Sequence, residues 1–424
     1  FAAGPIASVL DLPADVTGAP EGTNTALEVY GGLTSERRAL RIGGKAPGTA
    51  DYPFRASSAV VATNAAAQEV AVELAGALRQ PLGEPSVRLA AVGDIMLANV
   101  ISSNMAAQGV DQPFELVAPY LQQADITFGN LEGTFTDRGV AQPKNFTFRT
   151  PPELSGGLVN AGFDILSVAN NHTMDFGPEG LEDTLATLDF IGIARQGAGA
   201  NEAEARAPVV LEANGLRVGF LSYVNVGQEM RSNYVNQVAE ADEDSPGVAW
   251  ARPENVSADV AALEPQVDVV VVSMHIGIEG SFNLRDWQYD TAYAAIDAGA
   301  DLVLGHHAHV LQRIEHYGDG VIIFGLGNFV FDVANPGRNN TRSVIAYFEL
   351  TRDGVSGYDF IPALIDVAEN RPRPILDGSG TPILTHLLGI TELPADPTPP
   401  AESEAEEGGE SGEDATPTAV PAAE

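Results

Sequence analysis

Residues that could bind a metal follow several apolar, strand-like runs of this 424-residue chain. Such residues are found after four runs: Val87–Val92 is followed by Asp94, Ile165–Ala169 by Asn171 and His172, Val267–Met274 by His275, and Leu302–Leu304 by His306, His307 and His309. In an open α/β sheet the carboxyl ends of the strands face one crevice, so side chains that are distant in sequence can meet there. The pattern therefore predicts a metal site.

The candidate ligands combine two carboxylates, one amide oxygen and three imidazoles: Asp94, Glu132, Asn171, His275, His307 and His309. The chain has no cysteine, which excludes disulfides and thiolate ligands. The remaining donors suit a divalent transition metal, one or two ions of Mn, Fe or Zn. Two ions about 4 Å apart can hold the oxygens of a phosphate and lower the pKa of a bound water.

Other residues near these donors have predicted roles in catalysis or orientation. His172 follows Asn171 and could protonate a leaving oxygen, and Asp175 is spaced to orient it. If the chain is extended at His307 and His309, both imidazoles point to one side and Ala308 to the other. His306 should then point elsewhere, and His316 and His386, which have no partner motif, are treated as structural.

Each of these motifs also has a purely structural explanation. A single Asp after a strand is commonly a turn or cap residue, and Asn170-Asn171-His172 fits turn chemistry equally well. Gly129–Gly133, which places Glu132 just after Phe128, is a fifth motif of this kind. Five such motifs at strand ends of one domain favour a site over chance. The glycines of Gly325-Leu326-Gly327-Asn328-Phe329 remain open, because they could simply turn a strand.

The elements that must position these residues alternate between strands and helices. A strand is expected at Ala124–Phe128 after an amphipathic helix at Pro113–Gln122. A further helix should begin at Gly177-Pro178-Glu179, with Leu181, Leu185 and Leu188 on one face. Continuous apolar strands alternating with helices indicate an α/β fold whose sheet is covered on both faces. Further strands are expected at Leu216–Tyr223 and Val321–Phe324.

Charge and hydropathy exclude two classes of partner. The formal net charge is −36, and residues 392–424 hold ten acids and no base, which leaves −26 for the rest. Such a field repels phosphate backbones, so nucleic acid is excluded as a partner. No run approaches the ~18 consecutive apolar residues of a membrane span. Because the chain begins at Phe1 without a signal-like segment, we expect a fragment or processed product whose signal or anchor is missing.

Composition divides the chain into three parts. Residues 1–84 are expected to form a partial N-terminal region, and Leu40–Arg55 faintly resembles a truncated solute-binding-protein domain. Residues 85–375 should form the domain that carries the motifs. Residues 376–424, rich in Pro and Glu, are predicted to be a disordered tail.

The motifs together resemble the CapA family of poly-γ-glutamate capsule biosynthesis proteins, within the calcineurin-like metallophosphoesterase superfamily. The segments that carry the resemblance are Gly93–Met96, Asn130–Glu132, Ala169–Gly177, Gly305–Gln312 and Gly327–Asp332. The resemblance implies a four-layer α/β/β/α sandwich. It also implies that the six donors are ligands, with Glu132 bridging two ions and His172 acting as the acid or as a transition-state stabiliser.

The sequence departs from the superfamily pattern at three positions. The superfamily has Asp-x-His after its first strand, whereas this chain has Met96, so one ion would lose a ligand. Ile276 stands where the superfamily usually has an aromatic residue, and Ala308 stands where it usually has proline. Neither change removes a ligand.

The predicted function is that of a metal-dependent phosphoesterase-like hydrolase of capsule biosynthesis, extracellular or at the cell surface. Its partners would be the capsule polymer or a phosphate-containing small substrate, and membrane-bound capsule synthase subunits. The alternative is a non-catalytic component that binds the polymer or the synthase with the same fold. A third possibility, a binding protein fused to the enzyme-like domain, rests only on residues 1–84. An acidic polymer would need the metals or a basic patch, for which the candidates are Lys144, Arg149, Arg285 and Arg313.

Overall fold

Two β-sheets packed face to face form the centre of the computed structural model, which describes residues 85–226, 239–333 and 339–390. The predictions for residues 1–84 and 391–424 lie outside the described residues. The larger sheet has the order β18-β17-β16-β1-β2-β5-β6, with β15 also paired to β1. The smaller sheet has the order β13-β14-β12-β11-β9-β8.

The half of the larger sheet that bears site residues is parallel. It contains β1 (Val87–Ile95), β2 (Ile126–Leu131), β5 (Ile165–Ser167) and β6 (Ala194–Gln196). Antiparallel strands extend it on the other side: β16 (Arg342–Thr351), β17 (Gly354–Asp366) and β18 (Arg371–Pro374). The short β15 (Asn328–Val330) runs parallel to β1.

The smaller sheet is parallel at its centre and antiparallel at its edges. Its central strands are β9 (Leu216–Asn225), β11 (Val269–Ile276), β12 (Leu302–His306) and β14 (Gly320–Leu326). Its edge strands are β8 (Val209–Ala213) and β13 (Leu311–Tyr317). Two small ladders, β3 (Thr134–Phe135) with β4 (Arg149–Thr150) and β7 (Ala198–Gly199) with β10 (Gly247–Val248), lie outside both sheets.

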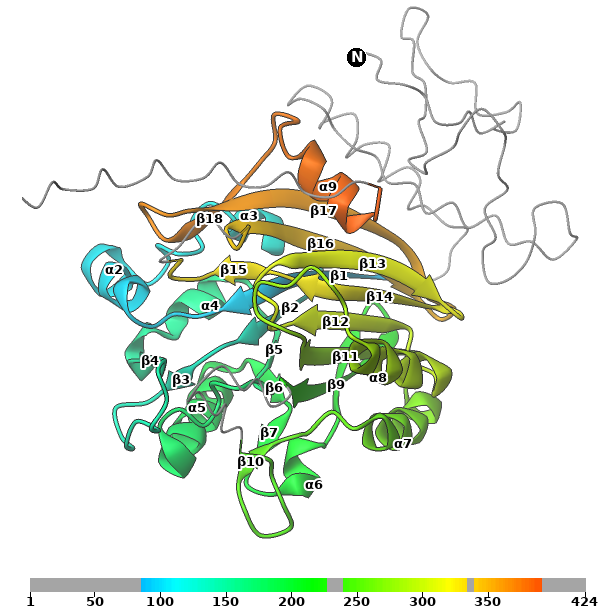
Figure 1. The fold of residues 1–424 in the computed structure, drawn as a ribbon, viewed down its shortest axis with the longest axis horizontal. Helices are drawn as coiled ribbons and strands as arrows, with labels where there is room; N and C mark the ends of the chain where they lie inside the picture. Colours follow the sequence, from blue (N-terminus) through cyan, green and yellow to red (C-terminus); the bar gives the residue numbers. More distant parts are fainter. Residues whose placement is uncertain (1–84, 227–238, 334–338, 391–424) are drawn as a thin grey trace, which may run out of the picture.

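Helices cover the outer face of each sheet. On the larger sheet lie α2 (Val100–Gln108), α3 (Ala118–Leu121), α4 (Gly156–Ala161) and α5 (Gly177–Ile191), and on the smaller sheet lie α7 (Pro253–Leu263) and α8 (Asp286–Asp297). In Figure 1, α2, α4 and α5 lie to the left of the strands, and α7 and α8 lie to the right. The described helices are all too short or too polar to cross a membrane. The remaining elements are α6 (Glu202–Ala205), η1 (Pro152–Leu154), η2 (Glu264–Gln266) and α9 (Thr381–Leu387).

The apolar strands explain these layers, because their side chains alternate between two cores. In β1, Leu89 and Ala91 lie between the sheets, whereas Ala90 and Val92 pack under the helices of the larger sheet. The strands of the smaller sheet alternate in the same way, so every central strand is buried on both faces. The expected four-layer α/β/β/α sandwich is confirmed.

Two sequence predictions about the elements were wrong. The helix expected at 113–122 is limited to α3, and turns precede it because Phe114 and Val117 are drawn into the core at irregular spacing. Residues 381–387, assigned to the disordered tail, form α9. Its Ile383, Leu384 and Leu387 pack into the core between the sheets, so the ordered chain extends beyond the boundary predicted at residue 375.

A partly buried carboxyl at the start of β12 should make stability depend on pH. Burial raises the pKa of Asp301 to about 6 even though its carboxylate accepts a hydrogen bond from the Val270 amide at 2.8 Å. The folded state therefore binds more protons than the unfolded state between the two pKa values, so stability falls as pH rises from about 4 to about 6. The penalty is up to about 3 kcal/mol.

We expect Asp301→Asn to remove this penalty, because asparagine keeps an acceptor oxygen without the charge. Urea unfolding should show the variant gaining free energy of unfolding relative to the wild type at pH 7.5, and gaining less at pH 4.5. The exposed Asp319→Asn serves as a control. An equal difference at both pH values would contradict the assignment.

Candidate metal centre

All six predicted ligands meet at the carboxyl ends of parallel strands from both sheets. His275 Nε2 lies 2.8 Å from Asn171 Oδ1 and 3.2 Å from His307 Nδ1. His309 Nδ1 lies 3.2 Å from Asp94 Oδ2, and its Nε2 lies 3.7 Å from Glu132 Oε1. The contact between Asn171 and His275 joins the two sheets, so the site exists only when both sheets are packed together.

Two glycines allow the backbone to bend into this site. A Cβ atom on Gly93 would lie 1.9 Å from the Gly327 carbonyl oxygen, and one on Gly305 would lie 1.9 Å from the Phe324 carbonyl oxygen. The Asp94 amide donates a hydrogen bond to that Gly327 oxygen at 2.9 Å. Any side chain at Gly93 or Gly305 would therefore push the strand carrying a ligand away from its neighbour.

The His-x-His segment differs from the extended chain that we predicted. β12 ends at His306, and both His307 (φ 82°) and His309 (φ 56°) occupy the left-handed region. Each such residue costs about 1–3 kcal/mol, and this strain is typical of functional sites. The expected outcome is nevertheless present: both imidazoles reach the site and Ala308 is buried.

His306 does not point away from the site as predicted. Its Nδ1 atom lies 3.3 Å from Asp94 Oδ1, and its ring packs against Phe128 with centroids 6.0 Å apart. His306 shares with Leu302 and Leu304 the face of β12 that lies between the sheets, and there it contacts Asp94. It supports a ligand rather than being remote from the site.

Three asparagines that the sequence did not assign as ligands support the donors. Asn130 Nδ2 donates to Asp94 Oδ1 at 2.9 Å and lies 3.2 Å from His275 Nδ1. Asn170 Nδ2 donates to the Leu131 carbonyl at 2.7 Å. Asn328 Oδ1 lies 2.8 Å from His309 Nδ1, which gives the Gly327-Asn328 motif a place beside the site. Such partners fix the orientation of ligands.

His172 is held beside Glu132 by a buried network. Its Nδ1 contacts Asp175 Oδ2 at 2.8 Å, as the spacing predicted, while its Nε2 lies 3.6 Å from Glu132 Oε1. Asp175 also accepts a hydrogen bond from the Phe148 amide at 2.6 Å and pairs with the Lys144 ammonium, which donates to the Asn171 carbonyl at 2.7 Å. Lys144 is therefore a buried part of this network, and it is not available to the basic patch for which it was a candidate.

Burial and charge set the protonation of the donors. Burial lowers the pKa of His275 well below its usual value and that of His307 to about 4, so both imidazoles are neutral at pH 7. Burial would also lower the pKa of His309, but the carboxylates of Glu132 and Asp94 raise it to about 10. Burial raises the pKa of Glu132, whereas contacts with His306 and His309 outweigh burial and hold that of Asp94 low.

The donors fit a divalent metal. Ligand atoms of Asp94, Glu132 and His309 lie within 4.8 Å of one another. Both carboxylate oxygens of Glu132 and His307 Nε2 are buried and have no hydrogen-bond partner among the described residues. Buried polar atoms without partners cost free energy, and coordination would satisfy them. Met96 is not suited to the same role, because its buried sulfur accepts the Ala98 amide at 3.2 Å.

Glu279, which lies in the loop after β11, was not among the residues predicted from the sequence. Its carboxylate and the imidazoles of His307 and His309 offer atoms within 4.8 Å of one another. The one feature of the sequence that could have indicated Glu279 is its position four residues after His275.

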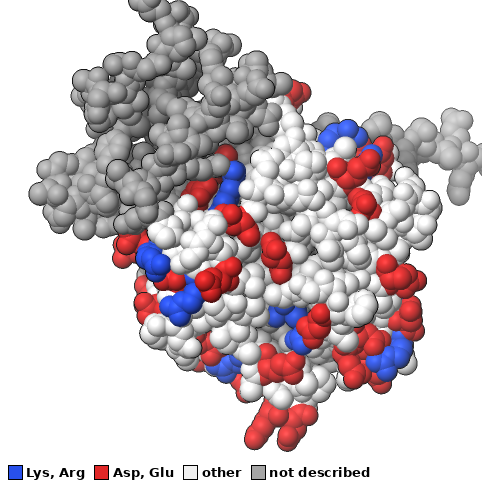
Figure 2. Space-filling view, turned by 180° about the vertical axis from the view of Figure 1, so that it is seen from behind, with Lys and Arg blue, Asp and Glu red and all other residues white. Residues whose placement is uncertain are grey.

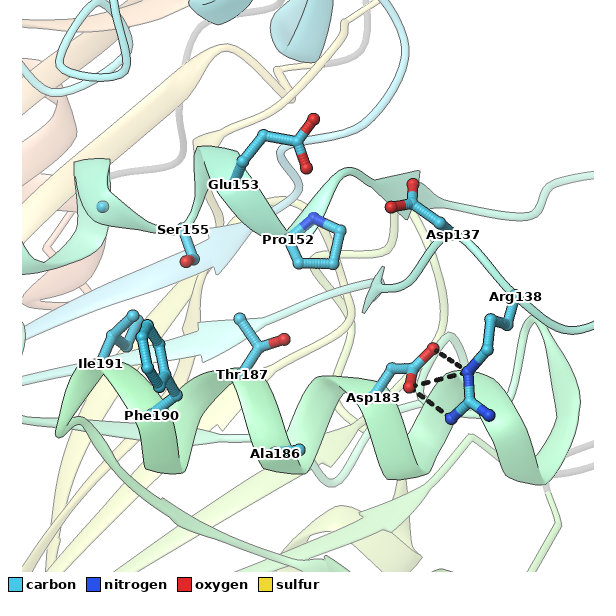
Figure 3. Close-up of a pocket in the computed structure, with 11 residues that line it drawn as sticks. Asp137, Arg138, Pro152, Glu153, Ser155, Asp183, Ala186, Thr187, Phe190 and Ile191 are labelled. Atoms are coloured by element: carbon cyan, nitrogen blue, oxygen red, sulfur yellow. Dashed lines mark hydrogen bonds and ion pairs between the residues drawn. The ribbon is translucent and has the colours of Figure 1, made fainter.

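A separate surface pocket of about 650 Å³ lies between η1 and α5 (Figure 3). Its lining includes Glu153, Phe190, and Arg138, whose guanidinium is held by Asp183 at 3.0 Å. None of the predicted site residues lines this pocket. The candidate chemistry is therefore located at the strand ends and not here.

Comparison with known proteins identifies the family. The model of the family described as bacterial capsule synthesis protein PGA_cap matches residues 88–333, more than half of the chain. The chain belongs to this family. The match includes all six predicted ligands, His172 and Asp175.

Two curated relatives carry related names. The PGA biosynthesis protein CapA of Bacillus subtilis is 32% identical over 288 residues, covering 67% of this chain and 72% of that protein. The capsule biosynthesis protein CapA of Bacillus anthracis is 32% identical over 293 residues, covering 67% and 68%. A solved 5'-nucleotidase of Candida albicans aligns with a TM-score of 0.40 and 10% identity over 73% of this chain and 58% of that one. The fold assignment itself rests on the two sheets and their helices.

We expect the double variant His307→Ala/His309→Ala to lose bound metal, because it removes two of the three imidazoles. Elemental analysis of purified protein should find stoichiometric Mn, Fe or Zn in the wild type and in a His316→Ala control, which alters a histidine outside the site. Circular dichroism would confirm that the double variant is folded. Equal metal content in the double variant and the wild type would rule out these ligands.

Proposed function

We propose that this member of the capsule synthesis family is a metal-dependent phosphoesterase-like hydrolase that acts at the cell surface. The observation that carries the proposal is the buried Glu132 carboxylate, which is surrounded by imidazole donors from both sheets and has no hydrogen-bond partner among the described residues. A structural core would not need such a group. A site that binds cations and stabilises negative charge would need it.

The residues around Glu132 supply the remaining parts of a hydrolytic site. When bound, a divalent metal would polarise a phosphoryl oxygen and lower the pKa of water. Asp94, Glu132, Asn171 and the three imidazoles would hold it. The Asp175 carboxylate fixes His172 through Nδ1, which leaves Nε2 facing Glu132 and available to protonate a leaving oxygen.

The charge of the protein favours a small group or a polymer end over a long stretch of polymer. The face of the described part shown in Figure 2 is largely uncharged, and acidic side chains are more widespread on it than basic ones. Lys144 is buried in the His172 network, and Arg313 is paired with Glu315. The net negative charge of the protein opposes the approach of a long polyanion, so we expect a small group or a polymer end to reach the metal centre. We propose a phosphate-containing substrate or the end of the capsule polymer, delivered by membrane-bound synthase subunits.

The proposal predicts metal-dependent cleavage of a model phosphodiester such as bis(p-nitrophenyl) phosphate. A chelator should abolish turnover, and added Mn²⁺ should restore it. The variant His172→Gln should lower kcat by about 10²–10⁴-fold while it keeps its metal, because it removes only a proton donor. His316→Gln is the matched control. If the metal-loaded wild type shows no chelator-sensitive turnover, catalysis is excluded for this substrate class.

A non-catalytic function is favoured by one observation, the presence of Met96 where the superfamily has a histidine ligand. In that case the fold would bind the polymer or the synthase without turnover. Cells carrying His172→Ala or Asp94→Ala should then still form capsule. Loss of capsule with both variants, at normal protein levels, would support the hydrolase.

A further inference from the structure

Glu279 reaches the metal centre from outside the set of strand-end donors. It lies in the loop between β11 and α8 and is exposed, whereas His307 is fully buried. Ligand atoms of Glu279, His307 and His309 lie within 4.8 Å of one another, as do those of Asp94, Glu132 and His309. The two groups have His309 in common, so Glu279 adds a further carboxylate to the same centre.

The backbone around Glu279 is tied to the His-x-His segment. The amide of Gly280, the next residue, donates to the Ala308 carbonyl at 2.8 Å, which lies between the two histidines in sequence. Gln312 Nε2 donates to the Ser281 carbonyl at 2.8 Å. These bonds fasten the loop immediately after Glu279 to the strand-end segment that carries His307 and His309. The proximity of the carboxylate to the imidazoles thus follows from specific contacts of the loop.

Two places at the metal centre, one at His307 and one near Asp94, lack a polar partner. His307 Nε2 is buried and has no hydrogen-bond partner among the described residues. The Asp94 side is also short of a donor, because Met96 is buried with its sulfur on the Ala98 amide. A thioether is a poor ligand for Mn²⁺, which prefers carboxylate oxygen. The Glu279 carboxylate, which lies close to His307 and His309, offers an oxygen ligand of this kind.

We propose that Glu279 is a metal ligand that supplies the centre with the donor that Met96 cannot provide. The proposal rests on the proposed metal-dependent function and extends it to a second ion. Glu279 holds that ion together with His309, and the loop of residues 277–284 becomes part of the metal site. Because Glu279 is exposed, an ion held there would be accessible to a phosphate group from solvent.

Titration of metal-free protein with MnCl₂ by calorimetry tests this assignment without relying on activity. The wild type should bind two ions per chain. Glu279→Gln, which keeps the size of the side chain, should keep one ion and bind the second at least about tenfold more weakly. Glu212→Gln, which changes an exposed glutamate of β8, is the matched control and should behave as the wild type.

Electron paramagnetic resonance of the Mn²⁺-loaded proteins provides a second readout. The wild type should give the signal of two coupled ions, and Glu279→Gln the signal of a single ion. Introducing Met96→His into Glu279→Gln should restore the second ion, since it returns a donor to the Asp94 side. A folded double variant that binds no second ion would overturn the claim that Glu279 substitutes for a ligand at position 96.

The possible failures are distinguishable. Identical stoichiometry and affinity in Glu279→Gln and the wild type would overturn the role of Glu279 while leaving the other six ligands in place. A wild type that binds no Mn²⁺ would overturn both this inference and the proposed function.

Discussion

The complete burial of two carboxylates among five histidines is the constraint on which this structure depends. Asp94 and Glu132 are both fully buried, and burying a charge is costly unless it is paired or bound to a metal. Asp94 is satisfied by Asn130 and by contacts with His306 and His309, whereas Glu132 accepts no hydrogen bond from the described residues. The two sheets must therefore pack so that the imidazoles of one reach the carboxylates of the other. This requirement couples the sandwich architecture to the site.

The local backbone is adapted to the same requirement. Gly93 and Gly305 permit contacts of strand backbones that no side chain would allow, and His307 and His309 adopt a conformation that is unfavourable for residues with a Cβ atom. Because these four positions flank or supply ligands, the cost in stability is concentrated where the side chains converge. The buried pair of Lys144 and Asp175 extends this arrangement, since it fixes His172 at the edge of the donor cluster. Fold stability and function thus compete at one end of the sheets.

The positions of the site residues could be predicted from sequence because apolar runs locate strand ends well. The ends of β1, β11 and β12 fell within three residues of the runs in the sequence, and one crevice then follows from parallel topology. The conformation of His307 and His309 could not be predicted, because periodicity carries no information on a left-handed φ. Glu279 was missed because its position depends on a hydrogen bond between distant loops. The helix α9 was missed because its apolar side chains stabilise it by packing on the core between the sheets, a contact that the local sequence does not reveal.

We propose that the strand-end donors of the two sheets form one metal centre. Anomalous diffraction from crystals grown with MnCl₂ tests it most directly, because it locates bound ions without assuming a substrate. We expect one peak among Asp94, Glu132 and His309 and a second beside His307, each within coordination distance of the named side chains. Crystals saturated with Mn²⁺ that show no anomalous peak at these residues would contradict it.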